Sequence, residues 1–247
     1  MKISELKNKK IIHICIILAI IVIIFVVAGI IMLKYQVEGE TKLPFELSRM
    51  IVVSTAESNE IEAAPDTKWN FSVSQNNDIY LEIQKNNEYT KSANIKNITF
   101  ENSGIEKNNG AENIKLYRAN SAGKVVEDEA HLVGSSLTYK GEKDTNLDEL
   151  KISNQGSIIL LRSVNQNVCE VRSNDEEIVH DGTLLAKGNA NLEDLNYKLS
   201  FDIIIETSRD IKYKGTISID LPTGNIGTEG KAQLEKTDFS DVIFKRM

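Results

Sequence analysis

The sequence predicts a mainly β protein: one N-terminal transmembrane helix followed by an extracellular β-sandwich-like domain. Three observations support this fold class. A 23-residue run, residues 11–33, contains no Asp, Glu, Lys, Arg, Asn or Gln. The remainder shows many short stretches in which apolar and polar residues alternate, the period of a half-buried strand. It contains almost no long stretch with the period of an amphipathic helix, and this combination is typical of a sandwich.

The run from Ile11 to Leu33 is long enough to cross a membrane. At about 1.5 Å per residue it spans roughly 34 Å, against a hydrocarbon core of about 30 Å. A single segment in lipid must bond its backbone to itself, so it crosses as a helix. Four lysines precede the run, whereas Glu38 and Glu40 soon follow it. The positive-inside rule then predicts a cytoplasmic tail over residues 1–10 and an outward-facing remainder.

Two other interpretations fit the run less well. A cleaved signal peptide has an apolar core of about 7–15 residues and a small-x-small cleavage site, and residues 30–34 (IIMLK) offer none. A lipoprotein needs a small residue before the modified cysteine, whereas Cys15 follows Ile14. We therefore expect an uncleaved signal-anchor that contacts the lipid bilayer through Ile11 to Leu33. A stalk over residues 34–42 and a β-rich domain over residues 43–247, in one lobe or two, follow it.

The charge of the outer part limits its partners. The chain has 29 basic and 36 acidic residues. Without the four N-terminal lysines and Glu5 it keeps 25 and 35, a formal charge near −10. This charge argues against nucleic acid as a partner and against tight docking on an anionic membrane surface. Cys15 in the membrane cannot meet Cys169 outside it, so no intrachain disulfide is expected.

The first strand is expected just after the stalk. Its apolar residues share one parity: Leu43, Phe45, Leu47, Ile51 and Val53. Arg49 interrupts this parity, which indicates a bulge or an edge position. A hairpin is expected next, with strands Trp69–Val73 and Ile79–Ile83, a turn at residues 75–78, and Trp69 in the core.

The middle of the chain is less regular. Strands are expected at residues 95–100 and 114–117, the second after an Asn109-Gly110 turn. Residues 119–148 are acidic and rich in turn formers, and we interpret them as loops with a short strand near residues 137–139. A strand ending at Leu150 and Ile152 leads to a turn at residues 154–156.

The second half begins with the apolar run Ile158–Leu161, expected as a central strand covered on both faces. A loop at residues 165–167 and a strand at Val168–Val171 follow. Helical turns are expected at Thr183–Lys187 and Asn191–Leu195, the second capped by Asn191.

The strongest β pattern comes last. The apolar positions of its first strand are Tyr197, Leu199, Phe201, Ile203 and Ile205. After a turn at residues 207–210, a second strand has Ile211, Tyr213, Ile217, Ile219 and Leu221 on one parity. Gly215 lies on the same face and indicates a bulge or a close approach. A short strand near Val242–Phe244 closes the pattern.

The sequence points to no catalytic, cofactor-binding or metal-ligating residue. Phosphate loops and the motifs of zinc proteases and serine hydrolases are absent. The densest cluster of potential ligands is Asp175, Glu176 and Glu177 beside His180 and Asp181. A weak Ca²⁺ or Zn²⁺ site is one interpretation of it, but its spacing matches no standard metal loop, and a solvated acidic turn is favoured. The triplet Glu127, Asp128 and Glu129 is also interpreted as a solvated acidic turn. Cys169 is interpreted as a small apolar residue. The sequon Asn97-Ile98-Thr99 falls inside an expected strand.

Several stretches resemble a group of uncharacterised single-pass membrane proteins of clostridia and related Gram-positive bacteria. They are YQVEGETKLPFELSRMIVVSTAE, KWNFSVSQNNDIYLEIQKN, LDELKISNQGSIILLR, SNDEEIVHDGTLL and LPTGNIGTEGKAQLEKTDFSDVIFKR. The resemblance covers nearly the whole chain. It implies a bacterial cell membrane and an outward-facing domain, and it implies no activity or functional residue.

Three functions are compatible with these observations. The first is a non-enzymatic binding or structural protein of the cell envelope, with another envelope protein or a wall component as partner. The second is a ligand-sensing or regulatory subunit that signals through a membrane partner, since a ten-residue tail has no room for an output domain. The third is a cell-surface hydrolase, for which His131 and His180 are the histidines outside the expected span.

Overall fold

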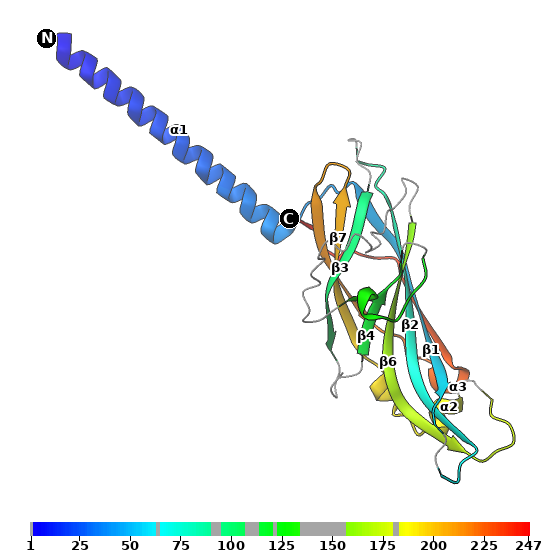
Figure 1. The fold of residues 1–247 in the computed structure, drawn as a ribbon. Helices are drawn as coiled ribbons and strands as arrows, with labels where there is room; N and C mark the ends of the chain where they lie inside the picture. Colours follow the sequence, from blue (N-terminus) through cyan, green and yellow to red (C-terminus); the bar gives the residue numbers. More distant parts are fainter. Residues whose placement is uncertain are drawn as a thin grey trace.

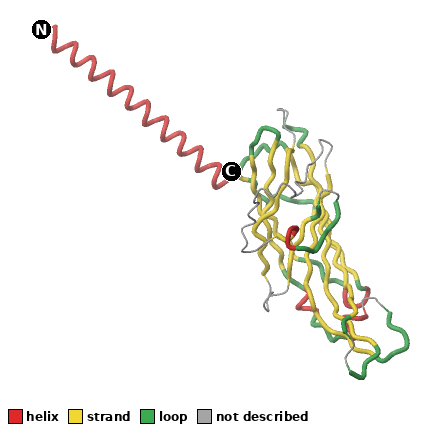
Figure 2. Tube along the Cα trace, viewed as in Figure 1, coloured by secondary structure: helices red, strands yellow, loops and turns green. Residues whose placement is uncertain are grey.

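The computed structural model describes residues 2–62, 65–89, 95–106, 114–120, 123–133, 157–179 and 183–247. A long N-terminal helix leads into an elongated body of two antiparallel sheets (Figure 1). Strands make up most of this body, and the short helices lie mainly at its far end (Figure 2). The predicted fold class, an apolar helix followed by a mainly β, sandwich-like domain, is confirmed.

Helix α1 runs from Lys2 to Glu38. Its part from Ile12 to Glu38 is long and apolar enough to cross a membrane, and none of the most apolar window within it is buried. Large apolar side chains such as Phe25 and Met32 are 73% and 72% exposed. An apolar stretch that is exposed on all sides of a helix is the kind of surface that a membrane span presents to lipid. The helix continues through residues 34–38, so the first half of the expected stalk is helical.

The larger sheet has six strands in the order β5-β4-β6-β2-β1-β9. Their bounds are β1 Phe45–Glu60, β2 Trp69–Lys85, β4 Ile114–Arg118, β5 Leu132–Val133, β6 Ser157–Ser173 and β9 Lys231–Lys236. The smaller sheet has the order β10-β8-β7-β3. Its strands are β3 Ile95–Glu106, β7 Lys198–Thr207, β8 Lys212–Asp220 and β10 Lys245–Arg246.

The described residues also form four short helices: η1 Glu129–His131, α2 Thr183–Lys187, η2 Leu192–Leu195 and α3 Ile226–Glu229. The two predicted helical turns are confirmed as α2 and η2. The Asn191 side chain accepts a hydrogen bond from the Glu193 backbone N–H, so the predicted N-cap is confirmed as well. Helix α3 and strand β9 were not predicted, because residues 226–236 contain too few apolar residues to show the apolar–polar alternation of a strand.

Strand β1 contains the bulge that Arg49 indicated, as its pairing with β2 shifts between Leu47 and Arg49. A bulge inserts a residue and turns the following side chains to the opposite face. Met50 and Val52 are therefore fully buried. The expectation that Ile51 and Val53 face the core is wrong, since both are only partly buried.

The predicted hairpin at residues 75–78 is wrong, because β2 continues without a turn from Trp69 to Lys85. Strand β6 likewise continues through residues 165–167, where a loop was expected. The two strands shift register here, with Val73 opposite Cys169 and Gln75 opposite Asn165. Asn167 adopts φ 54° within the bulge. The polar residues thus mark a bulge inside a continuous strand.

The central strand β6 is covered on one face only. Ile159 and Leu161 are buried, whereas Ile158 is 68% exposed. The expectation that this run is covered on both faces is wrong, because no layer covers this stretch of the outer face among the described residues.

A buried layer of polar side chains crosses the middle of the sandwich. We call it the polar belt; its members are Ser54, Gln75, Asn77, Ser163, Asn165 and Tyr197, all at most 5% exposed. The Asn77 amide donates to the Tyr197 hydroxyl at 2.9 Å and to the Ser163 carbonyl at 3.3 Å. Gln75 donates to the Leu195 carbonyl at 3.0 Å, and Ser54 donates to Asn77. These bonds satisfy groups that burial would otherwise penalise.

The belt lies between two apolar clusters. The larger one fills the end of the sandwich nearer α1 and includes Phe45, Phe201, Tyr213 and Phe244. The smaller one lies at the far end beneath α2 and α3 and includes Phe71, Val171 and Ile226. Trp69, expected in the core, is partly buried beside this cluster, stacked on Phe71 with 6.0 Å between ring centroids.

The last strands match the sequence pattern. All five apolar positions predicted for the first strand are buried, and so are Tyr213, Ile217 and Ile219 on β8 and Leu221 just after it. Ile211, just before β8, is only partly buried. Gly215 is a close approach and not a bulge, since a Cβ there would lie 2.9 Å from the Phe244 ring. Val242 and Phe244 are buried as expected, but the closing strand β10 is formed by Lys245 and Arg246.

Some predictions lie outside the described residues. They are the turns at residues 109–110 and 154–156, the strands near residues 137–139 and 150–152, and His180 with Asp181.

Candidate functional site: the joint between helix and sandwich

The described part of the chain offers one region where the apolar helix is joined to the folded body. We call it the joint and define it by Gly39, Glu40, Tyr213 and Phe244. The Glu40 backbone N–H donates to the Phe244 carbonyl at 3.0 Å. The C-terminal segment therefore holds the chain in place where it leaves α1 and enters the sandwich.

Gly39 makes this contact possible. It adopts φ +72°, a conformation that disfavours a side chain, and a Cβ there would lie 2.6 Å from both Ile243 Cγ2 and the Phe244 carbonyl oxygen. A glycine immediately after a helix is the usual residue for ending it in this conformation. Here it also allows the backbone of residues 243–244 to lie directly against the helix end.

Aromatic packing fixes the other side of the joint. Phe45 meets Phe244 edge to face, with 5.0 Å between ring centroids and 83° between the planes. The same ring meets Tyr213 at 5.7 Å and 72°. Edge-to-face pairs each contribute about 0.5–1.5 kcal/mol beyond burial. The start of β1, the start of β8 and the C-terminal segment therefore form one packed unit next to α1.

A carboxylate lies beside the buried phenol of the joint. Burial, together with the negative charge of Glu40, raises the pKa of Tyr213 to about 12. The positive charge of Arg246 acts in the opposite direction. One carboxylate oxygen of Glu40, Oε2, is buried without a hydrogen-bond partner. The joint thus contains a charge that is only partly compensated.

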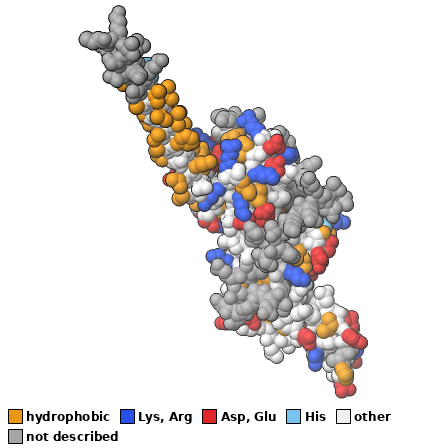
Figure 3. Space-filling view, turned by 60° about the vertical axis from the view of Figure 1, so that its left-hand side comes forward, with side chains coloured by type: hydrophobic (Ala, Val, Ile, Leu, Met, Phe, Trp, Pro, Cys, Tyr) orange, Lys and Arg blue, Asp and Glu red, His pale blue; other side chains and the backbone are white. Residues whose placement is uncertain are grey.

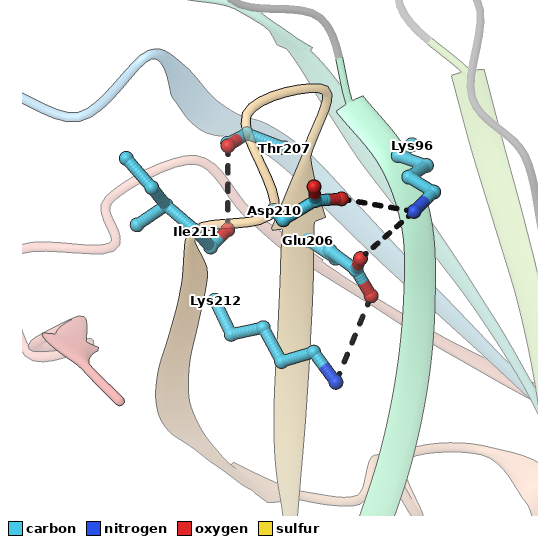
Figure 4. A network of polar contacts seen from close by, with 6 residues as sticks. All are labelled: Lys96, Glu206, Thr207, Asp210, Ile211 and Lys212. Atoms are coloured by element: carbon cyan, nitrogen blue, oxygen red, sulfur yellow. Dashed lines mark hydrogen bonds and ion pairs between the residues drawn. The ribbon is translucent and has the colours of Figure 1, made fainter.

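An ionic network ties the β7–β8 hairpin to β3 at the same end of the sandwich (Figure 4). Lys96 on β3 contacts Glu206 at 3.2 Å and Asp210 at 3.0 Å, and Lys212 contacts Glu206 at 3.7 Å. The hydrogen bond with Asp210 is the main cause that raises the pKa of Lys96. The Thr207 hydroxyl donates to the Ile211 carbonyl at 3.3 Å and closes the predicted turn. These exposed pairs orient the hairpin more than they stabilise it.

Some of the acidic residues singled out in the sequence make structural contacts. Asp128 caps η1 and accepts from His131 Nδ1 at 2.7 Å, and this hydrogen bond lowers the pKa of Asp128. Glu127 pairs with Arg162 at 3.3 Å. In the segment 174–179, Asp175 receives the Trp69 indole N–H on its backbone carbonyl at 3.0 Å. Within the described ranges, no group of three or more His, Cys, Asp or Glu side chains is placed to hold a metal ion.

The sequence pattern did not predict the ion pairs of Arg162 on the outer face of the larger sheet. Arg162 forms two hydrogen bonds with Asp78, at 2.7 and 3.1 Å, as well as its contact with Glu127. Asp78 lies opposite Arg162 on the neighbouring strand, so the pairing follows from the register. Because a turn was expected at residues 75–78, Asp78 was not predicted to lie on a strand opposite Arg162.

The structure also places Cys169 and the sequon residue Asn97. Cys169 is half-buried beside the smaller apolar cluster, where Gly188 leaves room for its Sγ, and burial raises the pKa of its thiol. Asn97 lies on β3 as predicted and is only 7% exposed. A buried amide in a strand is unsuited to carry a glycan in the folded protein.

Comparison of the chain with protein-family models, with curated proteins and with solved structures finds no match. The class that fold and joint define is an apolar-helix-tethered β-sandwich.

Proposed function

We propose that this protein is a membrane-anchored, non-enzymatic binding or structural protein of the cell envelope, with its β-sandwich outside the membrane. The feature that carries the proposal is the joint. The apolar helix is bonded through Glu40 to the body of the sandwich instead of being connected by a flexible linker. Such an attachment suits a protein whose task is to hold a domain in a fixed position relative to a membrane.

The long strands place the far end of the sandwich at a distance from the joint. Strand β1 has 16 residues and starts beside the joint, so it extends roughly 50 Å away from it. The far end exposes apolar side chains, with Val179 62% and Leu192 49% exposed. The far end is therefore the surface that the anchored protein presents to another envelope protein or a wall component.

Site-specific photo-crosslinking in intact cells tests this proposal. A photoreactive amino acid at Val179 or Leu192 is expected to yield a discrete adduct that mild competition with the purified full-length chain reduces. The same probe at Ile158, which is 68% exposed on the side of the sandwich, is the matched control. Equal, non-competable labelling from all three positions would count against a binding role for the far end.

The second candidate is a regulatory subunit that signals through a membrane partner. The rigid joint favours it, because a displacement of the sandwich reaches α1 directly through Gly39 and Glu40. Replacing residues 11–33 by an unrelated apolar span separates the two candidates. A tether keeps its phenotype after this exchange, whereas a signalling subunit loses it. A cell-surface hydrolase, the third candidate, has no supporting cluster among the described side chains.

A further inference from the structure

The C-terminal segment presents an unusual surface beside the joint. Val242 and Phe244 point into the apolar core, whereas Ile243 and Met247 are 50% and 67% exposed. Lys245 and Arg246, between them, are also exposed. The segment thus displays two apolar and two basic side chains.

Two more cations surround this segment. Lys42 precedes β1, and Lys85 pairs with Phe45, whose ring contacts Phe244. Both lysines are exposed. Among the residues that the structure describes, neither they nor Lys245 and Arg246 form an ion pair with an acid, whereas Lys96, Lys212 and Lys214 nearby do. We call the set Lys42, Lys85, Ile243, Lys245, Arg246 and Met247 the basal patch.

The joint fixes the distance between the basal patch and the end of the apolar run at Leu33. Residues 34–38 extend α1 by about 7–8 Å beyond Leu33. The headgroup layer on each side of a bilayer is roughly 5–7 Å thick. The Phe244 carbonyl is bonded to Glu40, two residues after the helix ends. If α1 crosses the membrane as proposed, the basal patch therefore stands at the outer limit of the headgroups.

Acidic residues lie at both ends of the sandwich. Near the basal patch, Glu38 pairs with Lys34 at 3.8 Å and Glu46 accepts from Gln84, and Glu88 is exposed as well. Exposed acids also gather toward the far end of the sandwich, at Glu57, Glu60, Glu62, Asp175, Glu176 and Glu177. The net charge of the outer part, which argues against membrane docking as a whole, is thus unevenly distributed. At about 50 Å from the surface these acids are screened, because the Debye length is about 8 Å at physiological salt. They would be repelled only if the sandwich lay down on the membrane.

We propose that the basal patch docks on anionic lipid headgroups of the membrane that α1 crosses, and so holds the sandwich upright. The proposal rests on the anchoring role proposed above. Basic side chains next to apolar ones are the combination that binds a charged interface. Continuity with the apolar helix keeps this surface within reach of lipid at all times. Each basic charge removed is expected to lower the ratio of docked to undocked protein about fivefold.

Spin labels on the full-length chain in nanodiscs test the proposal. In a Cys15→Ala/Cys169→Ala background, single labels replace Ile243 in the patch, Val179 at the far end and Val22 in the helix. In nanodiscs containing phosphatidylglycerol, the label at position 243 is expected to be shielded from a water-soluble relaxing agent, and the label at 179 to stay accessible. High salt or pure phosphatidylcholine is expected to remove the shielding at 243.

Charge variants test whether the basic side chains of the basal patch cause the docking. Lys245→Gln/Arg246→Gln is expected to reduce the docked ratio about twenty-five-fold, and Lys187→Gln/Lys231→Gln at the far end to leave it unchanged. A label at 243 that is as accessible as the one at 179 in both lipids overturns the docking proposal. The label at 22 reports insertion separately: if it too is accessible to water, the anchoring role itself has failed.

Discussion

At the residue scale, the polar belt explains how long strands with polar centres stay folded. Asn77 alone bonds to partners from β1, β6 and the residue before β7. Tyr197 adds a 2.7 Å contact with the Ser163 hydroxyl, and burial strongly raises the pKa of its phenol. Each member is satisfied only when the sheets are in register. We infer that the belt fixes the register between the two apolar clusters.

Replacing Tyr197 by Phe tests the belt. The substitution removes the hydroxyl that accepts from Asn77 and leaves buried polar groups without a partner, so the free energy of unfolding is expected to fall by about 1–3 kcal/mol. Denaturant unfolding measures this change. Tyr80→Phe, at a 37% exposed position, is the matched control and is expected to change stability by less than about 0.5 kcal/mol. Equal effects at both positions would contradict the belt's role.

The joint predicts a dependence of stability on alkaline pH. An unfolded tyrosine has a pKa of about 10, whereas that of folded Tyr213 is about 12. Between these values the unfolded chain has released the proton and the folded protein retains it, so the free energy of unfolding falls as pH rises. Tyr213→Phe is expected to flatten this part of the stability curve. A variant curve parallel to that of the wild type from pH about 9 to 12 would argue against the shifted phenol.

At the element scale, the alternating strands β7 and β8 were predictable, and so were the short helices α2 and η2. In each, local residues decide the structure: a two-residue period, a turn at residues 207–210, or an Asn cap. The continuous paths of β2 and β6 were not predictable from such signals. Gln75 and Asn165 are typical turn residues, and their partners lie about 30 to 120 positions away in the chain. The joint was missed for the same reason, since Gly39 meets Phe244 from the opposite end of the sequence.

Gly39→Ala tests the joint as an element. The left-handed backbone costs an alanine about 1–2 kcal/mol, and the contact with the Phe244 carbonyl adds to this. We expect exchange of the Glu40 amide hydrogen to accelerate at least tenfold, because its bond to Phe244 is lost. Gly29→Ala, where a Cβ meets nothing within 4 Å, is the control and is expected to leave that amide protected. Unchanged protection in Gly39→Ala would show that the helix is not held as described.

At the scale of the whole molecule, one organisation connects these features. An apolar helix with exposed side chains on all sides is bonded to one end of an elongated sandwich, and both basic and acidic side chains are exposed at that end (Figure 3). The opposite end carries acidic and apolar side chains roughly 50 Å away. The sequence alone indicated the apolar helix and the sandwich, but not which end of the sandwich is bonded to the helix.

Topology labelling in intact cells tests the central claim most directly. A membrane-impermeant maleimide is applied to Val179→Cys and, separately, to Ser4→Cys, each in the Cys15→Ala/Cys169→Ala background. The account predicts that position 179 is labelled in intact cells and that position 4 is labelled only after the membrane is permeabilised. Labelling of position 4 but not 179 in intact cells would reverse the orientation, and labelling of both in a soluble fraction would contradict the membrane anchor.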